Sequence, residues 1–482
     1  RGPKGRNPKD FWNYSGKDYA GTWKLRKKGQ PFFTVYNIGD SHESRAFGDH
    51  KDESVDPKKM ILAPYHPDLP EMRNTYAKYS SAISKMDSLV GQAIENLKQD
   101  GLYENTIIVY NSDHGGVLAR SKRFLYSSGI HCPLIVRIPE KMKHLYPQGK
   151  SPGSTIDRIV SFIDMPKTWV SLTGAEMKEN FQGRIFLGPE TEPQSQYHFS
   201  WRGRADERFD CVRVMRDKQF AYHKNYAPFA PNGQYLAYMH NMKATGAWER
   251  HHQAGKTNAV TGRFFKPRPS EEFYDNFKDF HNIDNQIDDP LHQTKIKELK
   301  KELRRQQLKY FDSGLMPEEM RNRIIKEKNT TVYAFVRDPK LYPLAQYLDY
   351  ADLALTRKKK NLKSFTKGLT DEDPVKRYWS VIGLLLLEKQ AKPAISELKK
   401  VLGDRDEIPA FASWAIYKAG EKTFAEKWML EAITQNPGNK TLANIFDWMG
   451  TASHSLLAKI PGDKLPQKGL LKDVVKRSGV QN

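Results

Sequence analysis

The sequence predicts an α/β protein with a smaller antiparallel-sheet domain and a C-terminal α-helical region. Two short apolar runs, residues 107–110 and 133–136, flank a polar loop, as buried strands of an α/β sheet do. Apolar and charged residues alternate between about residues 201 and 226, which is typical of antiparallel strands. Beyond Pro290 the composition shifts to helix formers.

Composition and charge limit the possible classes of protein. The chain has 482 residues, 38% of them hydrophobic, which is enough for packed cores in two or three domains. Its net charge of +21 indicates a polyanionic partner, and nucleic acid and a sulfated polysaccharide both satisfy that charge, although no nucleic-acid motif is present. No apolar run is long enough to span a membrane, and no signal peptide is visible. Two cysteines exclude a disulfide framework, and Cys132 is predicted to be buried in the core.

Residues 1–195 are predicted to form the α/β core. We expect a strand over residues 32–37 and a covering helix over residues 71–100, where apolar side chains recur with helical spacing. The strand at residues 107–110 follows almost at once. Residues 157–172 are predicted to form a strand and then a helix, which ends at Gly174.

The polar loop after residues 107–110 carries Asp113 and His114, followed by two glycines. One carboxylate beside one imidazole suits a hard or borderline divalent cation. Polar groups just beyond the carboxyl end of a strand also lie where open α/β sheets bind substrates. A simple turn with an N-capping aspartate explains the local pattern equally well. The loop alone therefore leaves both interpretations open.

Four blocks of the sequence resemble the formylglycine-dependent sulfatases of the alkaline phosphatase superfamily. They are residues 31–45 (PFFTVYNIGDSHESR), 76–116, 122–139 (KRFLYSSGIHCPLIVRIP) and 159–174 (IVSFIDMPKTWVSLTG). A fifth block near Pro269, PSEEFYDNFKDFHNIDNQIDDP, resembles the C-terminal signature of the family. The SHES block is similar to that of the bacterial heparan N-sulfatase-like branch. The resemblance implies an alkaline-phosphatase-like core, a mixed sheet flanked by helices.

The resemblance also implies roles for single residues in these blocks. His42 matches the histidine that donates to the sulfate group and protonates the leaving oxygen, and an exposed loop histidine is the alternative. Lys122 matches the lysine that neutralises sulfate, and a solvated surface lysine is the alternative. Asp113 and His114 match half of a calcium site. His131 either faces the substrate or is a structural histidine. Arg120 and Arg123 are expected on the surface or behind the site.

Two features of the family are not found in the sequence. They are a pair of adjacent metal-binding aspartates and the Cys-x-Pro-x-Arg or Ser-x-Pro-x-Arg motif whose first residue becomes the formylglycine nucleophile. We therefore expect the 482 residues to be part of a longer sulfatase. The alternative is a protein that cannot turn over unaided. Either way, these residues alone are expected to be inactive on sulfate esters.

Residues 196–290 are predicted to form a small antiparallel-sheet subdomain, which in sulfatases packs beside the active-site cleft. A charged cluster in this region resembles an Arg-x-Asp-Glu element of the bacterial branch. It is expected to bind the sugar ring and neighbouring sulfates, and a salt-bridged turn is the alternative. The cluster consists of Arg202, Arg204, Asp206 and Glu207.

The rest of the chain is predicted to be helical and noncatalytic. Residues 291–344 form a helical linker that begins with a polar, charge-rich helix, KIKELKKELRRQQLKYF. Residues 345–482 are predicted to form HEAT-like helical repeats and a tail, because similar amphipathic helices recur there. A plain helical bundle is the alternative.

These features together predict a sulfatase that hydrolyses sulfate esters, or an N-sulfate, of a sulfated polysaccharide or glycosaminoglycan. A calcium ion and formylglycine are its expected cofactors, and no specific nucleic acid or membrane span is expected. The resemblance implies a periplasmic or extracellular location. Two alternatives stay open: a phosphoesterase of the same superfamily, with a serine or threonine nucleophile and often two zinc ions, and a noncatalytic protein that binds sulfated glycans.

Overall fold

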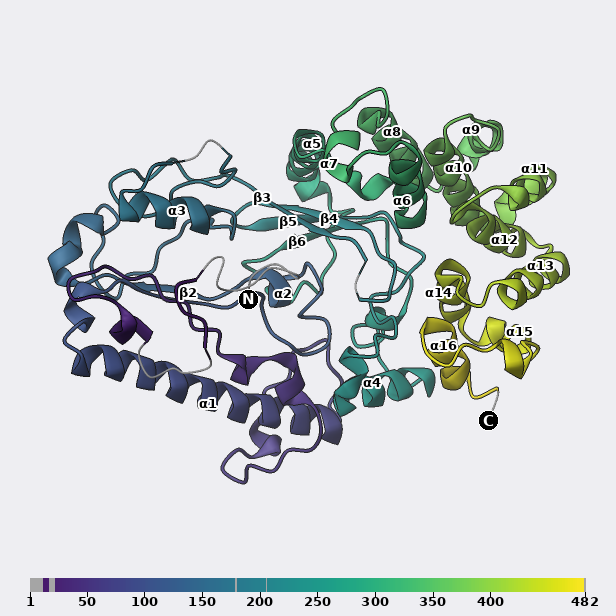
Figure 1. Ribbon diagram of the computed structural model, residues 1–482. Helices are drawn as coiled ribbons and strands as arrows, with labels where there is room; N and C mark the ends of the chain where they lie inside the picture. The colour runs from purple at the N-terminus through teal and green to yellow at the C-terminus, as the bar shows by residue number, and fades with distance from the viewer. Residues whose placement is uncertain (1–11, 17–21, 178–179, 205, 481–482) are drawn as a thin grey trace. The chain divides into compact units, whose positions relative to one another are not determined.

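The computed structural model describes residues 12–16, 22–177, 180–204 and 206–480. The chain divides into two compact units and passes between them more than once. Unit 1 comprises Arg1–Lys122, Ser128–Gln196 and Tyr238–Lys256, and unit 2 comprises Arg123–Ser127, Tyr197–Ala237 and Thr257–Asn482 (Figure 1). Among the described helices, none combines the length and the apolar character needed to cross a membrane.

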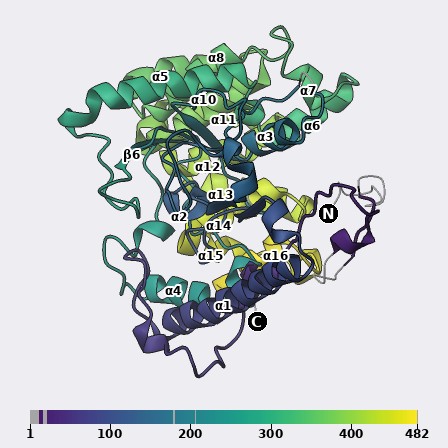
Figure 2. The ribbon, with the colours of Figure 1, turned by 90° about the vertical axis from the view of Figure 1, so that its left-hand side faces the viewer.

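Unit 1 contains a long helix and a two-stranded antiparallel ladder. Helix α1 (Pro70–Gln99) begins on a proline, which suits a first helical turn because it has no N–H to leave unbonded. Strand β1 (Ile108–Asn111) pairs with β2 (Leu134–Arg137). All three elements lie one residue from their predicted bounds. The other helices are α2 (Ser127–Ile130), α3 (Asp164–Thr173) and α4 (Lys243–Gln253), and α4 lies against α1 (Figures 1 and 2).

Two strands predicted for unit 1 are not formed. Residues 32–37 have no regular secondary structure, although their exposure alternates as in a strand, and no strand among the described residues bonds to them. Phe33 and Val35 are consequently 61% and 50% exposed. The first half of residues 157–172 is also irregular, whereas the second half forms α3 and ends at Gly174 (φ 68°) as predicted. Alternation predicts where side chains point, but a strand also needs the backbone of a partner.

Unit 2 begins with a four-stranded antiparallel sheet, which confirms the predicted small sheet. Helix α5 (Gln293–Lys309) covers one face through Ile296, Leu299 and Leu303 (Figure 1). The opposite face buries Val214 and Ala221. In sheet order the strands are β3 (His198–Arg202), β4 (Val212–Arg216), β5 (Phe220–Asn225) and β6 (Glu271–Asp275).

The C-terminal part of unit 2 is helical, as predicted, and shares one large apolar core. Helix α10 packs against both α8 and α12, and α12 also contacts α13 and α14. Stacking of each helix on its near neighbours agrees with a repeat architecture, and the HEAT-like assignment stays a prediction. The helices are α6 (Glu318–Glu327), α7 (Val332–Phe335), α8 (Leu344–Leu355), α9 (Leu362–Gly368), α10 (Pro374–Leu387), α11 (Ile395–Lys400), α12 (Ile408–Ala419), α13 (Lys422–Gln435), α14 (Lys440–Met449), α15 (His454–Leu457) and α16 (Leu470–Ser478).

Glu407 has a buried carboxylate, which contacts the first turn of α6. Its oxygens accept the backbone N–H of Glu319 at 2.8 Å and that of Met320 at 3.2 Å. Burial raises the pKa of Glu407 to about 7, and the nearby charge of Glu319 acts in the same direction. These two effects outweigh the backbone hydrogen bonds to the carboxylate, which favour the ionised form.

We therefore expect unit 2 to lose stability as the pH rises from about 4.5 to about 7. Folded Glu407 keeps its proton in this window while the unfolded chain releases it, so the free energy of unfolding falls with pH, by up to about 3 kcal/mol. Glu407→Gln should remove this contribution. Native-state hydrogen exchange of α6 and α12 amides, corrected for intrinsic rates, measures the difference. Parallel pH profiles for the two proteins would contradict this assignment.

Candidate functional site

The loop that carries Asp113 is fixed by backbone hydrogen bonds to α2. The N–H of Gly115 donates to the carbonyl of Gly129 at 2.8 Å, and the N–H of Gly116 donates to that of Ser128 at 2.9 Å. A Cβ atom on Gly115 would lie 2.2 Å from the carbonyl oxygen of Ser128. Only glycine allows this close approach, so the two glycines hold the loop in a defined position.

Asp113 and His114 project side by side from this loop. Oδ1 of Asp113 lies 3.6 Å from Nε2 of His114, and the aspartate side chain is 92% exposed. Nδ1 of His114 lies 2.8 Å from the carbonyl oxygen of Gly115, so Nδ1 carries the hydrogen and Nε2 is the nitrogen suited to a metal. Within the described ranges, no group of three or more His, Cys, Asp or Glu side chains could hold a metal ion. The pair thus fits part of a site, since calcium takes about six to eight ligands.

Cys132 lies close to this pair and is half-buried, not the fully buried residue that the sequence predicts. Burial raises the pKa of its thiol, and the charge of Asp113 adds to this effect against a hydrogen bond with Ser112. The thiol therefore stays protonated at neutral pH, which makes it a poor nucleophile.

His42 lies between two 3-10 helices, η3 (Gly39–Ser41) and η4 (Glu43–Ala46), and its side chain caps η4. The backbone N–H of Ser44 donates to Nδ1 of His42 at 3.3 Å. The neutral ring therefore carries its hydrogen on Nε2, which makes Nε2 the donor available to a substrate. The ring of Tyr238 packs edge-on against the imidazole, with 6.1 Å between centroids.

Lys122 occupies a loop with an unusual backbone conformation. Arg120 (φ 71°) and Arg123 (φ 80°), on either side of it, are both left-handed. Such a conformation costs on the order of 1 kcal/mol or more for a residue with a Cβ atom and persists where the surroundings enforce it. The Lys122 N–H donates to the carbonyl of Gly116 at 2.9 Å, which ties this residue to the Asp113 loop. Its ammonium lies 3.2 Å from the fully buried carboxylate of Glu43.

These residues come from three parts of the sequence and share one electrostatic neighbourhood in unit 1. Partial burial lowers the pKa of His42, the positive charge of Lys122 lowers it further, and Glu43 and Asp113 oppose the shift. The hydrogen bond of Lys122 to Gly116 and its ion pair with Glu43 bring the His42 and Asp113 segments together, and His114 also acts on the pKa of His42. Because its pKa lies below the ordinary value, His42 is mainly neutral at neutral pH when no anion is bound.

The sequence does not predict two other residues of this neighbourhood, Glu43 and Tyr238. Glu43 lies in the SHES block next to His42, but nothing in the block indicates that its carboxylate is buried against Lys122. Tyr238 begins the segment Tyr238–Lys256, which joins unit 1 from far along the chain. It is 38% exposed, and its ring also packs against Phe47 at 5.1 Å.

Two further residues of unit 1 are predicted at the site or near it. His131 is exposed, and Cys132 and Pro133 separate it from β2. Arg120 is buried, with its guanidinium 4.3 Å from the centroid of the Tyr65 ring. Arg120 is therefore a packed residue and not a surface one.

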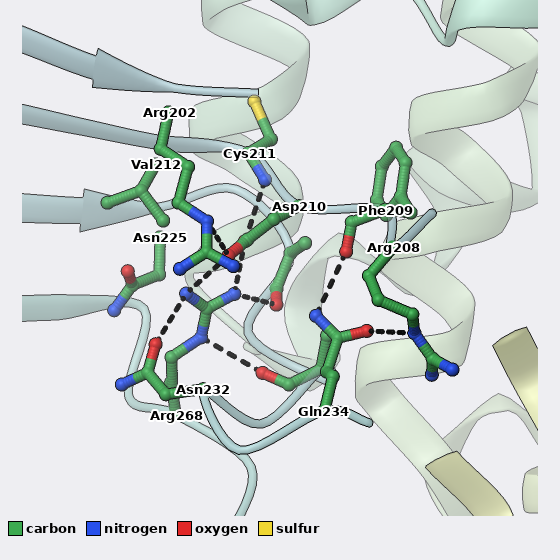
Figure 3. A network of polar contacts seen from close by, with 12 residues as sticks. Arg202, Arg208, Phe209, Asp210, Cys211, Val212, Asn225, Asn232, Gln234 and Arg268 are labelled. Atoms are coloured by element: carbon green, nitrogen blue, oxygen red, sulfur yellow. Dashed lines mark hydrogen bonds and ion pairs between the residues drawn. The ribbon is translucent and has the colours of Figure 1, made fainter. Parts of the chain in front are cut away.

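The predicted substrate-binding cluster lies in unit 2, and Arg202 is its buried member. The Arg202 side chain is 6% exposed, and its Nε lies 3.1 Å from Oδ2 of Asp210. Its guanidinium also lies 4.4 Å from the centroid of the Phe124 ring. Arg268 approaches the same carboxylate from the other side, at 2.5 Å (Figure 3). Arg202 thus belongs to a buried ionic network beneath the end of the sheet.

The other three members of the cluster form ion pairs and a hydrogen bond within unit 2. Nε of Arg204 lies 2.8 Å from Glu318, Asp206 accepts from Nε of Arg123 at 2.8 Å, and Glu207 accepts from the N–H of Ala237 at 2.8 Å. These contacts are those of a salt-bridged turn. The sugar-binding role of the cluster stays a prediction.

Comparison with known proteins finds sulfatases among the similar proteins. Residues 16–175 match the family described as Sulfatase. The chain is 32% identical over 375 residues to an ulvan-active sulfatase of Formosa agariphila. This alignment covers 69% of this chain and 60% of the relative. It is 31% identical over 128 residues to an N-acetylglucosamine-6-O-sulfatase of Bacteroides thetaiotaomicron, with coverage of 26% and 21%. A solved structure of a complex with D-glucosamine-2-N,6-O-disulfate aligns at 21% identity with a TM-score of 0.35, covering 50% of this chain and 42% of that chain.

Residues 16–175 are thus similar to the sulfatase family. These matches confirm the predicted α/β sulfatase fold class. The chain spans 60% of the length of the ulvan-active relative.

Proposed function

We propose that the protein is a sulfuric ester hydrolase that removes sulfate from a sulfated polysaccharide or glycosaminoglycan. One observation carries this proposal: in the segment that matches the Sulfatase family, Lys122 is bonded to the Asp113 loop through Gly116 and is paired with Glu43, the neighbour of His42. The ulvan-active and N-acetylglucosamine-6-O-sulfatase relatives support a sulfated glycan as the substrate.

Each residue of the neighbourhood has a distinct part in this reaction. The Lys122 ammonium binds a sulfuryl oxygen, and Glu43 holds that ammonium in place. His42 donates from Nε2 to the oxygen that joins sulfur to the sugar. The negative charge of a bound sulfate favours the imidazolium, which then protonates the leaving oxygen. Because the free imidazole is mainly neutral, substrate binding and proton uptake by His42 are coupled.

Sulfatases generally use formylglycine and a divalent metal, which supply the nucleophile and polarise the sulfate. Asp113 and His114 would contribute two of the metal ligands, and we propose calcium as the ion. The resemblance of the SHES block supports the heparan N-sulfatase-like branch, and the family resemblance supports a periplasmic or extracellular location. The recurring amphipathic helices of residues 345–482 support HEAT-like repeats. Sugar contacts are proposed for Arg204, Asp206, Glu207 and His131, whereas Arg202, predicted with them, is buried against Asp210.

Sulfate release from a panel of polymers tests the proposed function. An active preparation is incubated with ulvan and with heparan sulfate, and inorganic sulfate is measured by ion chromatography. Release of sulfate above that from buffer alone is expected for at least one polymer. Phosphate release from phosphate esters without any sulfate release would favour the phosphoesterase. Tight binding of the polymers without turnover in any preparation would favour the noncatalytic binding protein.

Lys122→Ala should lower the rate of sulfate release by about a hundredfold, the usual effect of removing one group that stabilises a developing oxyanion. Glu43→Gln should act in the same direction and less strongly, because the ammonium remains but loses its buried anchor. Initial rates under subsaturating substrate measure both effects. Lys141→Ala, at an exposed lysine of the same unit, is the matched control. Equal rates in the Lys122 and Lys141 variants would exclude the role given to Lys122.

A further inference from the structure

A segment of unit 2 carries an unusual density of positive charge. Residues 357–367 (RKKKNLKSFTK) contain six basic residues and no acidic one. We call the five lysines of this segment the basic turn. Each of them is exposed. They are Lys358, Lys359, Lys360, Lys363 and Lys367.

The backbone beneath the basic turn is held in a fixed conformation. Arg357 is left-handed (φ 53°), and its guanidinium donates to the carbonyl of Arg268 at 3.3 Å. The amide of Asn361, which is buried, donates to the hydroxyl of Thr356 at 2.9 Å. Phe365 anchors α9 in the apolar core with 1% of its surface exposed. The lysines are therefore displayed by an ordered support.

The spacing of the lysines places several of them on one side of this support. Lys360, Lys363 and Lys367 are three and then four residues apart, which is the spacing of neighbours on one helix face. The face opposite them carries Phe365, so it is turned to the core. Helix α9, which holds Lys363 and Lys367, packs against α10 (Figure 1).

The basic turn gathers five lysines with no acidic residue among them. Some other cations of unit 2 face carboxylates, such as the exposed Lys400 with Glu397 at 2.8 Å and the half-buried Arg323 with Asp406 at 2.8 Å. In the part of the chain that the structure describes, no carboxylate forms an ion pair with any lysine of the basic turn. The carboxylate of Glu388 acts on Arg357, but it is paired with Lys418 at 3.2 Å.

This arrangement does not serve stability. Like charges on one helix face destabilise it by roughly 0.2–0.5 kcal/mol per pair. A surface that only needs solubility interleaves both signs. The left-handed backbone at Arg357 adds a further cost of on the order of 1 kcal/mol. An external polyanion would supply the missing counter-charges and offset these costs.

We propose that the basic turn is a binding site for a sulfated polysaccharide, separate from the His42 and Lys122 neighbourhood. Lysine ammoniums are compact point charges that suit sulfate groups without requiring a planar geometry. The segment exposes no aromatic side chain on which unpaired bases could stack, since Phe365 is buried. The preference for a sulfated polysaccharide over duplex nucleic acid rests on the proposed function. A polymer bound to the basic turn would have a higher effective concentration at a second site on the same protein.

Binding measurements on the whole chain test this site without requiring turnover. Affinities for heparin, chemically desulfated heparin and a DNA duplex are measured by fluorescence anisotropy over a series of salt concentrations. The test protein carries Lys359→Gln, Lys363→Gln and Lys367→Gln. The control protein carries Lys459→Gln, Lys464→Gln and Lys468→Gln, which remove the same charge from exposed positions of the same unit. Circular dichroism verifies that both proteins are folded.

The test protein should bind heparin about tenfold more weakly than the wild type, with a slope of log affinity against log salt reduced by about 2. The control should change affinity by less than about twofold, and desulfated heparin should bind weakly to all three proteins. An equal loss in the control and the test protein would overturn the proposal, as would unchanged heparin affinity. A loss confined to DNA would overturn it in favour of a nucleic-acid site. Sulfate release from a small aryl sulfate by an active preparation should be unchanged in the test protein, so failure of the proposed function and failure of this site are distinguishable.

Discussion

Asp113→Ala is expected to lower sulfate release by about three orders of magnitude while leaving the fold intact. A ligand to a catalytic cation acts on transition-state charge worth several kcal/mol, and about 4 kcal/mol corresponds to a thousandfold in rate. The same change should cost little stability, because the Asp113 side chain is 92% exposed and its nearest charged partner is His114 at 3.6 Å.

The measurement compares initial rates of sulfate release and thermal unfolding for the wild type, Asp113→Ala and Asp87→Ala. Asp87 is an exposed carboxylate on α1 of the same unit, so its replacement removes the same charge away from the site. Adding calcium over a wide concentration range should partly restore the Asp113 variant if the remaining ligands still bind the ion. A rate close to that of the Asp87 variant, with the same calcium dependence, would mean that Asp113 is not a ligand.

The sequence singles out candidate chemical groups more readily than their supports. The SHES block and the Asp-His-Gly-Gly loop single out His42 and Asp113, because each lies among several neighbouring residues that resemble a family pattern, and their roles stay predictions. Glu43 lies in the same block, yet its burial against Lys122 depends on a fold that brings two distant loops together. Tyr238 has no local signal at all, because it reaches His42 from a segment about two hundred residues away.

The differences between the predicted and the observed fold have a similar cause. Helix α1 and strands β1 and β2 are predicted within one residue because their periodicity and their glycine or proline boundaries are local properties. Residues 32–37 have the same kind of pattern but lack a bonded neighbour among the described residues, so the pattern alone does not produce a strand. The position of Arg202 is also not a local property. The burial of Arg202 depends on Asp210, which lies in the segment that connects β3 to β4.

Asp210→Asn is expected to destabilise the sheet of unit 2 by about 3–5 kcal/mol, the usual cost of breaking a buried ion pair. The Asp210 carboxylate is fully buried and lies within 3.1 Å of Arg202 and 2.5 Å of Arg268 (Figure 3). Asparagine keeps the size of the side chain but removes its charge. Two guanidiniums then remain buried with no carboxylate between them, and neither can lose its proton at an accessible pH.

Native-state hydrogen exchange of the β4 and β5 amides measures this loss within unit 2, which avoids treating a two-unit chain as a single cooperative transition. Asp349→Asn is the control, because it removes a carboxylate that is 67% exposed and paired with Arg304 at 2.7 Å. That exposed pair should contribute less than about 1 kcal/mol. Adding Arg202→Met to Asp210→Asn should recover part of the stability, since the methionine can pack over the Phe124 ring without a charge. Equal protection in the Asp210 and Asp349 variants would show that the network contributes no more than a surface ion pair. Recovery with Arg202→Met would instead identify the uncompensated charge as the cause.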